Sequence, residues 1–309
     1  MVSFITLFIG TAMNASPVKI SFLDSGDALK QTADFLTTKG CDSNSINLFR
    51  TVVHWNNESP LGFNLKKFPK SENGFYSFQS VSNLAKALTQ PLIYANHPYQ
   101  LNCFDFVILL TADSMKIEHQ ADDLTGPFLP PVNMTNKDDV AMGAAATPRD
   151  AYNESYPSWH IEASKAVFDE SRQNKRMCLT AAFNAFQILP ISTTRENLEN
   201  TLLNTLQEGW KRQGIAFPTN MEIVLFHSVI LNEHNSLTSH AGLLFQNHGQ
   251  YIYLEKAGPS GPYVRLDFSN KKELLSWFKV AIKPVADKGN FLCATFNDRQ
   301  IESLGMVGR

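Results

Sequence analysis

The sequence has few charged residues and no run of positive charge, which excludes several classes of partner. Only 18% of its 309 residues are charged, the net charge is −2 and the pI is near 6.4. It contains no basic-aromatic alternation and no glycine-rich phosphate-binding motif. The only lysine pairs are typical of a solvated surface: Lys66-Lys67 and Lys271-Lys272. We therefore expect no nucleic-acid partner.

Long apolar runs are also missing, so we expect no transmembrane segment. Outside the N-terminus, no segment approaches the roughly 20 apolar residues that span a bilayer. Val2 to Ile9 is almost wholly apolar, and Gly10-Thr11-Ala12 then offers a small-x-small cleavage pattern. Residues 1–12 thus resemble a secretory signal, although no positive residue precedes the apolar run. Export to the periplasm or cell surface is expected; a buried first strand and a cytoplasmic location are the alternatives.

Cysteine is scarce. The four cysteines lack the paired spacing of a zinc site, although their even number permits disulfides in an exported protein. They are Cys41, Cys103, Cys178 and Cys293. Three histidines close together in sequence keep a metal site as an alternative: His234, His240 and His248. No acidic or thiol residue has a spacing that supports this site, and we expect no metal and no cofactor.

Cys103 stands where a polar loop gives way to an apolar segment that is typical of a helix. Asn102 is suited to cap that helix, and Asp105 supplies an acidic residue in its first turn. Free N–H groups and the positive end of the helix dipole then favour a thiolate at Cys103. Cys103 is therefore a candidate nucleophile. A small buried cysteine that only packs is the alternative, and Cys178, within a second helical segment, ranks below Cys103.

A second candidate group lies on a predicted β-hairpin formed by residues 238–245 and 250–256. A loop of two residues, His248-Gly249, or of four would place Glu255 diagonally across from His240 on the same face. A three-residue loop would turn Glu255 to the opposite face. The alternatives are a polar residue at a strand entry for His240 and a solvated strand end for Glu255.

Together these residues suit thiol-dependent hydrolysis. Attack on a carbonyl carbon needs a thiolate beside an imidazole that a third group orients. We expect Cys103 to lie within hydrogen-bonding reach of His240, with Glu255 as the orienting group. Backbone N–H groups at the helix start are available to the developing oxyanion, and the amides of Gln100 or Asn102 are candidate second donors.

At these positions the chain resembles a family of bacterial, mostly exported proteins that share the papain-like fold of NlpC-type cell-wall peptidases. The similarity is carried by 49–56, Asn102-Cys103, 209–217, 240–244, and Glu255-Lys256 with Pro262-Tyr263. An arginine usually follows the cysteine in this family, and Phe104 replaces it here. The resemblance implies a thiol hydrolase, but fold analogy does not establish a reaction.

The pattern predicts an α+β fold, with a helical N-terminal part packed on a C-terminal antiparallel sheet, as a single papain-like domain over residues 13–309. Helices are predicted over 24–39, 43–55, 80–89 and 102–116, and one to Arg212 behind a capping box of Thr193 and Glu196. Strands are predicted at 221–231, in the hairpin, and at 263–268 and 290–296, with a helix capped by Asn270 after the third. Residues 122–150 are predicted to be an irregular connection.

We therefore expect a cysteine hydrolase of an amide bond. Its substrate would be a peptide or small amide, with a bacterial cell-wall peptide as the first candidate. Other peptidase, acyltransferase and small-amide hydrolase activities are alternatives. A non-catalytic exported binding protein that retains the fold is the alternative outside enzymes, favoured by the replacement of the arginine by Phe104.

Overall fold

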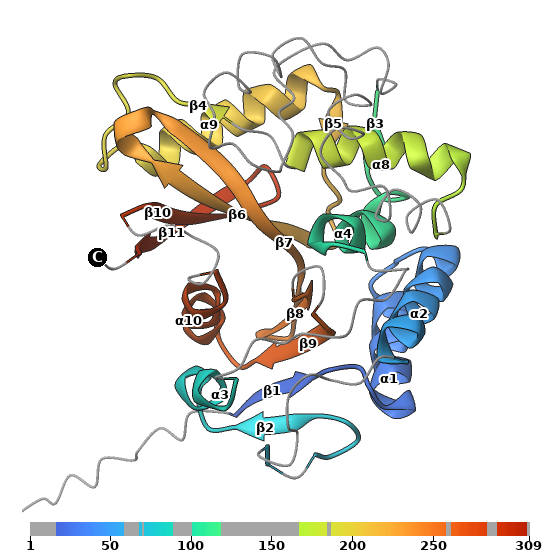
Figure 1. Cartoon of the computed structure of the whole chain (residues 1–309). Coiled ribbons are helices and arrows are strands. Elements are labelled where there is room, and N and C mark those ends of the chain that lie inside the picture. The colour runs from blue at the N-terminus through green and yellow to red at the C-terminus, as the bar shows by residue number, and fades with distance from the viewer. Residues whose placement is uncertain are drawn as a thin grey trace, which may run out of the picture.

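The structure is a computed structural model that describes residues 17–58, 68–69, 71–88, 101–118, 167–183, 187–257, 261–282 and 289–307. It combines helices with a large antiparallel sheet (Figure 1), so the predicted α+β class is confirmed. The predicted signal at 1–12 and the irregular connection at 122–150 lie outside the described residues. No helix in the described part of the chain is both long and apolar enough to cross a membrane.

The main sheet has nine strands, all paired antiparallel. Its order is β11-β10-β6-β7-β8-β9-β1-β2, and β4 pairs with β7 beside this path. The strands are β1 (Val18–Ser21), β2 (Tyr76–Phe78), β4 (Gln187–Ile188), β6 (Glu222–Ile230), β7 (Asn235–Asn247), β8 (Gln250–Lys256), β9 (Tyr263–Phe268), β10 (Phe291–Phe296) and β11 (Gln300–Met306). A two-stranded sheet pairs β3 (Lys116–Ile117) with β5 (Ile215–Ala216).

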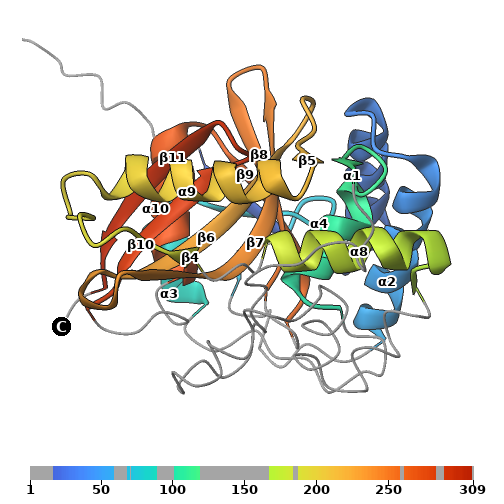
Figure 2. The same cartoon turned by 90° about the horizontal axis from the view of Figure 1, so that it is seen from above.

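Helices cover both faces of the curved sheet (Figures 1 and 2). One face packs against α1 (Gly26–Thr38), α2 (Ser43–Asn57), α4 (Cys103–Thr111), α8 (Glu170–Phe183) and α9 (Leu198–Arg212). The other face packs against α3 (Val81–Ala87) and α10 (Lys271–Ile282). Alternation along the strands therefore supplies two separate hydrophobic cores.

The first core surrounds α4, which is buried along its whole length. Val107 and Leu110 belong to this core together with Ala241 and Leu243 of β7. A helix that is apolar on all sides needs neighbours on all sides, and α2, α8 and the sheet provide them. The N-terminus of α4 is thereby fixed against β7 and β8.

Two predicted helices differ from the structure by more than two residues at one end. The helix predicted to run to Lys116 ends at Thr111, because Lys116 pairs with Ala216 in β3-β5. The predicted capping box of Thr193 and Glu196 is wrong. Helix α9 begins at Leu198, and the Asn197 side chain accepts a hydrogen bond from the Thr194 N–H at 2.7 Å instead of capping the helix.

The N-terminal part, predicted to be helical, also contributes strands. β1 pairs with β9 on one side and with β2 on the other. Strand β11, which pairs with β10, was missed at the other end of the sheet. The N-terminal part therefore supplies strands to the main sheet in addition to the helices that pack on it.

Candidate active site

Helix α4 begins at Cys103, as the sequence predicts. The Asn102 side chain accepts a hydrogen bond from the Asp105 N–H at 2.8 Å, and the Asp105 carboxylate accepts one from the Asn102 N–H at 3.4 Å. This capping box engages the Asn102 amide, which was a candidate oxyanion donor. The N–H groups of Cys103 and Phe104, at the first two helical positions, have no acceptor within a helix. Gln100, the other candidate donor, lies outside the described residues.

The hairpin β7-β8 closes with a two-residue loop. Asn247 pairs with Gln250, so His248 and Gly249 form the turn, with positive φ angles of 49° and 83°. Two such residues are the geometry of a type I′ turn, which matches the twist of a hairpin. Gly242 consequently pairs with Glu255, and His240 lies two residues before Gly242 on the same face. This is the register in which Glu255 reaches His240.

The structure brings the three candidate residues together. The Nε2 atom of His240 lies 2.8 Å from Oε2 of Glu255, and the His240 ring also forms a hydrogen bond with the side chain of Cys103. Burial disfavours the charged imidazole. The charge and hydrogen bond of Cys103, followed by the hydrogen bond and charge of Glu255, outweigh burial and raise the pKa of His240 from 6.5 to about 10. These contacts favour the charged form of the His240 imidazole.

All three side chains are shielded from solvent. Cys103 is 7% exposed, the Glu255 side chain 3% and the His240 side chain 13%. Low exposure strengthens the electrostatic coupling among them, and the imidazole retains the largest opening to solvent. The β6-β7 register shifts between Phe226 and His227, so Ser239 of β7 is the extra residue of a bulge next to His240. A bulge bends its strand and changes the direction of the neighbouring side chains.

Tyr253 and Gly242 both lie beside Glu255, and no local pattern in the sequence indicates this role for either residue. Tyr253 is fully buried, and its pKa is well above the ordinary value because burial and the charge of Glu255 disfavour the phenolate. A Cβ atom on Gly242 would lie 2.2 Å from the Tyr253 hydroxyl oxygen. Residue 242 must therefore be glycine for the tyrosine to lie beside the carboxylate.

A buried ion pair joins α4 to α8. Asp105 and Arg176 are both fully buried, and Arg176 Nε lies 2.5 Å from Asp105 Oδ1. An unpaired carboxylate two residues from Cys103 would oppose a thiolate, and the guanidinium offsets that charge. No local pattern in the sequence indicates this role of Arg176, because its partner is 71 positions away.

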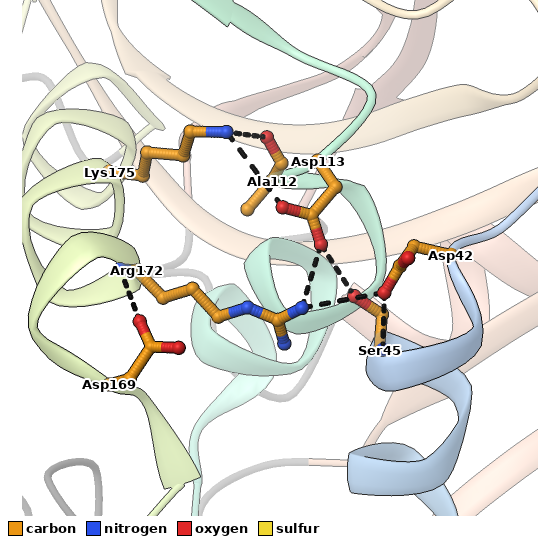
Figure 3. A network of polar contacts seen from close by, with 7 residues as sticks. All are labelled: Asp42, Ser45, Ala112, Asp113, Asp169, Arg172 and Lys175. Carbon is orange, nitrogen blue, oxygen red and sulfur yellow. Dashed lines mark hydrogen bonds and ion pairs between the residues drawn. The ribbon is translucent and has the colours of Figure 1, made fainter.

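One turn earlier on α8, a second network anchors the same helix (Figure 3). Arg172 lies 2.9 Å from the Asp113 carboxylate, just beyond the end of α4, and 3.4 Å from Asp42, which caps α2. Lys175 donates to the carbonyl oxygen of Ala112 at 3.1 Å. Helix α8 is thus tied to both ends of α4.

The other three cysteines and the two histidines near His240 in sequence all lie among the described residues. Cys178 is a fully buried residue within α8, and none of the four cysteines takes part in a disulfide. Burial, with a smaller contribution from a nearby carboxylate, raises the pKa of Cys41 and of Cys293 to about 12. His234 and His248 flank opposite ends of the 13-residue strand β7. Among the described residues, no group of three or more potential ligands is placed to hold a metal ion.

Comparison with known proteins gives one match. Residues 159–291 match a family model described as a domain of unknown function (DUF4300). The matched segment includes His240 and Glu255 and ends before the last strand, but it does not include Cys103. No curated protein and no solved structure matches the chain.

Proposed function

We propose that this protein is a papain-like cysteine hydrolase that cleaves an amide bond, with Cys103 as nucleophile, His240 as general base and acid, and Glu255 as orienting group. The observation that carries the proposal is the contact series from Cys103 through the His240 ring to Glu255. Glu255 holds Nε2, which leaves Nδ1 to exchange a proton with sulfur.

The reaction follows from these roles. The Cys103 thiolate attacks the carbonyl carbon and forms a C–S bond, and negative charge develops on the carbonyl oxygen. The imidazolium of His240 then gives its proton to the leaving amine as the C–N bond breaks, which yields a thioester. His240 next removes a proton from water, the water oxygen attacks the thioester, and the C–S bond breaks. Carboxylic acid and thiolate are released, and the imidazolium is regenerated.

The proposed substrate is a peptide, and a bacterial cell-wall peptide is the first to test. This choice rests on the resemblance of the chain to exported NlpC-type proteins, and export of this protein is part of the same proposal. Among the described residues, the site itself consists of a nucleophile, a base and an orienting group. Such a site suits transfer of an acyl group without a cofactor.

The test compares the wild-type protein with Cys103→Ala and with Cys178→Ala as a matched control for loss of a buried thiol. Each is incubated with peptides released from bacterial cell wall and, separately, with a denatured protein, and the products are identified by mass spectrometry. New amine and carboxylate ends are expected with wild type and Cys178→Ala but not with Cys103→Ala.

Retention of activity in Cys103→Ala would refute the assignment. A wild-type protein that cleaves none of these substrates, and whose Cys103 reacts no faster than its other cysteines, would favour a non-catalytic binding protein with the same fold.

A further inference from the structure

Lys256 is a fully buried lysine that follows Glu255 on β8 and points to the opposite face of the sheet. Its Nζ donates hydrogen bonds to Oδ1 of Asn56, at 3.2 Å, and to the carbonyl oxygen of Gly261. The ammonium also lies 5.0 Å from the centre of the Tyr263 ring. A buried cation needs such acceptors, because it has been withdrawn from water.

This cation is close enough to the nucleophile to interact with its charge. Burial lowers the pKa of Lys256 to about 7, and the negative charge of Cys103 acts in the opposite direction. The packing agrees with this proximity. The centre of the Tyr263 ring lies 5.4 Å from the ring centre of Phe106 and 6.4 Å from that of Phe49 in α2. Phe106 is one helical turn from Cys103 on α4. The end of α2, β8 and the start of α4 therefore meet here.

Asn56 is the unusual member of this group. It is 5% exposed, near the C-terminus of α2, and its Oδ1 accepts from Lys256. Its Nδ2 is buried and has no hydrogen-bond partner among the described residues. A buried donor without an acceptor costs stability, so such groups are retained where a ligand supplies the acceptor.

The geometry points to Asn56 Nδ2 as a donor to the carbonyl oxygen of the substrate as that oxygen becomes an oxyanion. Lys256 is the positioning residue: it fixes the carboxamide through Oδ1 and places positive charge near the centre where negative charge develops. Asn56 would thus join the N–H groups at the start of α4 in an oxyanion site. This inference rests on the proposed function, because it concerns the same reacting carbonyl group.

Two reagents that attack the same thiol separate an oxyanion role from other effects. With p-nitrophenyl acetate, a C–S bond forms through a tetrahedral oxyanion, and the C–O bond breaks as p-nitrophenolate leaves with the electron pair. With iodoacetamide, a C–S bond forms as iodide leaves, and no oxyanion appears. The ratio of the two rate constants at Cys103, measured on the full chain, therefore reports oxyanion stabilisation independently of thiol reactivity.

We expect Asn56→Ala to lower this ratio by about 10²- to 10³-fold, the usual effect of losing one oxyanion donor. Asn47→Ala, an exposed position on the same helix, is the control and should keep the wild-type ratio. Lys256→Met should also lower the ratio, and Lys256→Gln, which retains a donor toward Asn56, should lower it less.

A wild-type ratio in folded Asn56→Ala would overturn the inference. The role of Lys256 would be overturned if folded Lys256→Gln and Lys256→Met both keep the wild-type ratio and lose only stability. If Lys256→Met does not fold, the ratio measured for Lys256→Gln decides. If neither reagent reacts faster with wild-type Cys103 than with the other cysteines, the proposed function itself fails.

Discussion

His227 provides a prediction that connects burial with acid stability. It lies on β6, is 1% exposed, and its ring nitrogens lie 3.0 Å from the Thr295 hydroxyl and 3.3 Å from the Thr238 hydroxyl. Burial lowers its pKa from 6.5 to about 3. The unfolded chain therefore binds a proton below pH 6.5 that the folded protein accepts only near pH 3. Burial of the neutral His227 imidazole therefore stabilises the folded state above pH 6.5, and this stabilisation is lost as the pH falls toward 3.

The size of the effect follows from these two pKa values. Between pH 7 and pH 5, proton binding at His227 in the unfolded chain should lower the free energy of unfolding by about 2 kcal/mol. His227→Gln remains neutral, so its deficit relative to wild type should shrink by about that amount over this range. Urea unfolding followed by circular dichroism at both pH values measures it, with His54→Gln, an exposed position on α2, as control. A deficit that does not change with pH would refute the assignment of a neutral buried imidazole.

Three other predictions concern the site. Iodoacetamide at about pH 6 should label Cys103 much faster than the other three cysteines, as peptide mapping would measure; uniform labelling would remove the basis for a thiolate. Glu255→Gln should lower turnover by about two to four orders of magnitude in a protein that circular dichroism shows to be folded, and full activity would leave a Cys-His dyad. Gly242→Ala should cost about 1 to 3 kcal/mol in urea unfolding, because its Cβ would overlap the Tyr253 ring. Gly209→Ala, where a Cβ would meet nothing within 4 Å, should cost nothing.

Local signals predicted the elements whose geometry is decided within a few residues. Asn102 and Asp105 form the capping box that begins α4, Asn270 caps α10 through the Glu273 N–H, and Gly40 follows α1 with a φ of 77°. The hairpin turn restricted the register of Glu255 to a few possibilities. Such features depend on backbone groups that are close in sequence, so they can be predicted from a few neighbouring residues.

The missed elements depend on partners far away in the chain. Strand β1 has four residues and pairs with β9 on one side and with β2 on the other. No periodicity in the local sequence indicates either pairing. The same holds for Arg176, whose buried carboxylate partner is on another helix, and for Asn56, which Lys256 reaches across 200 positions. Tertiary packing alone brings these groups together.

The two-residue turn of the β7-β8 hairpin has a consequence for how this protein tolerates change. Surface loops usually accept insertions and deletions, but here Glu255 and Lys256 are consecutive residues that face opposite sides of the sheet. One residue added between His248 and Gly249 would favour a shifted register, with a cation beside His240 and a carboxylate beside Asn56. The exposed turn therefore sets the sign of the charge on each side of Cys103, and its length should be as constrained as the buried residues that it aligns.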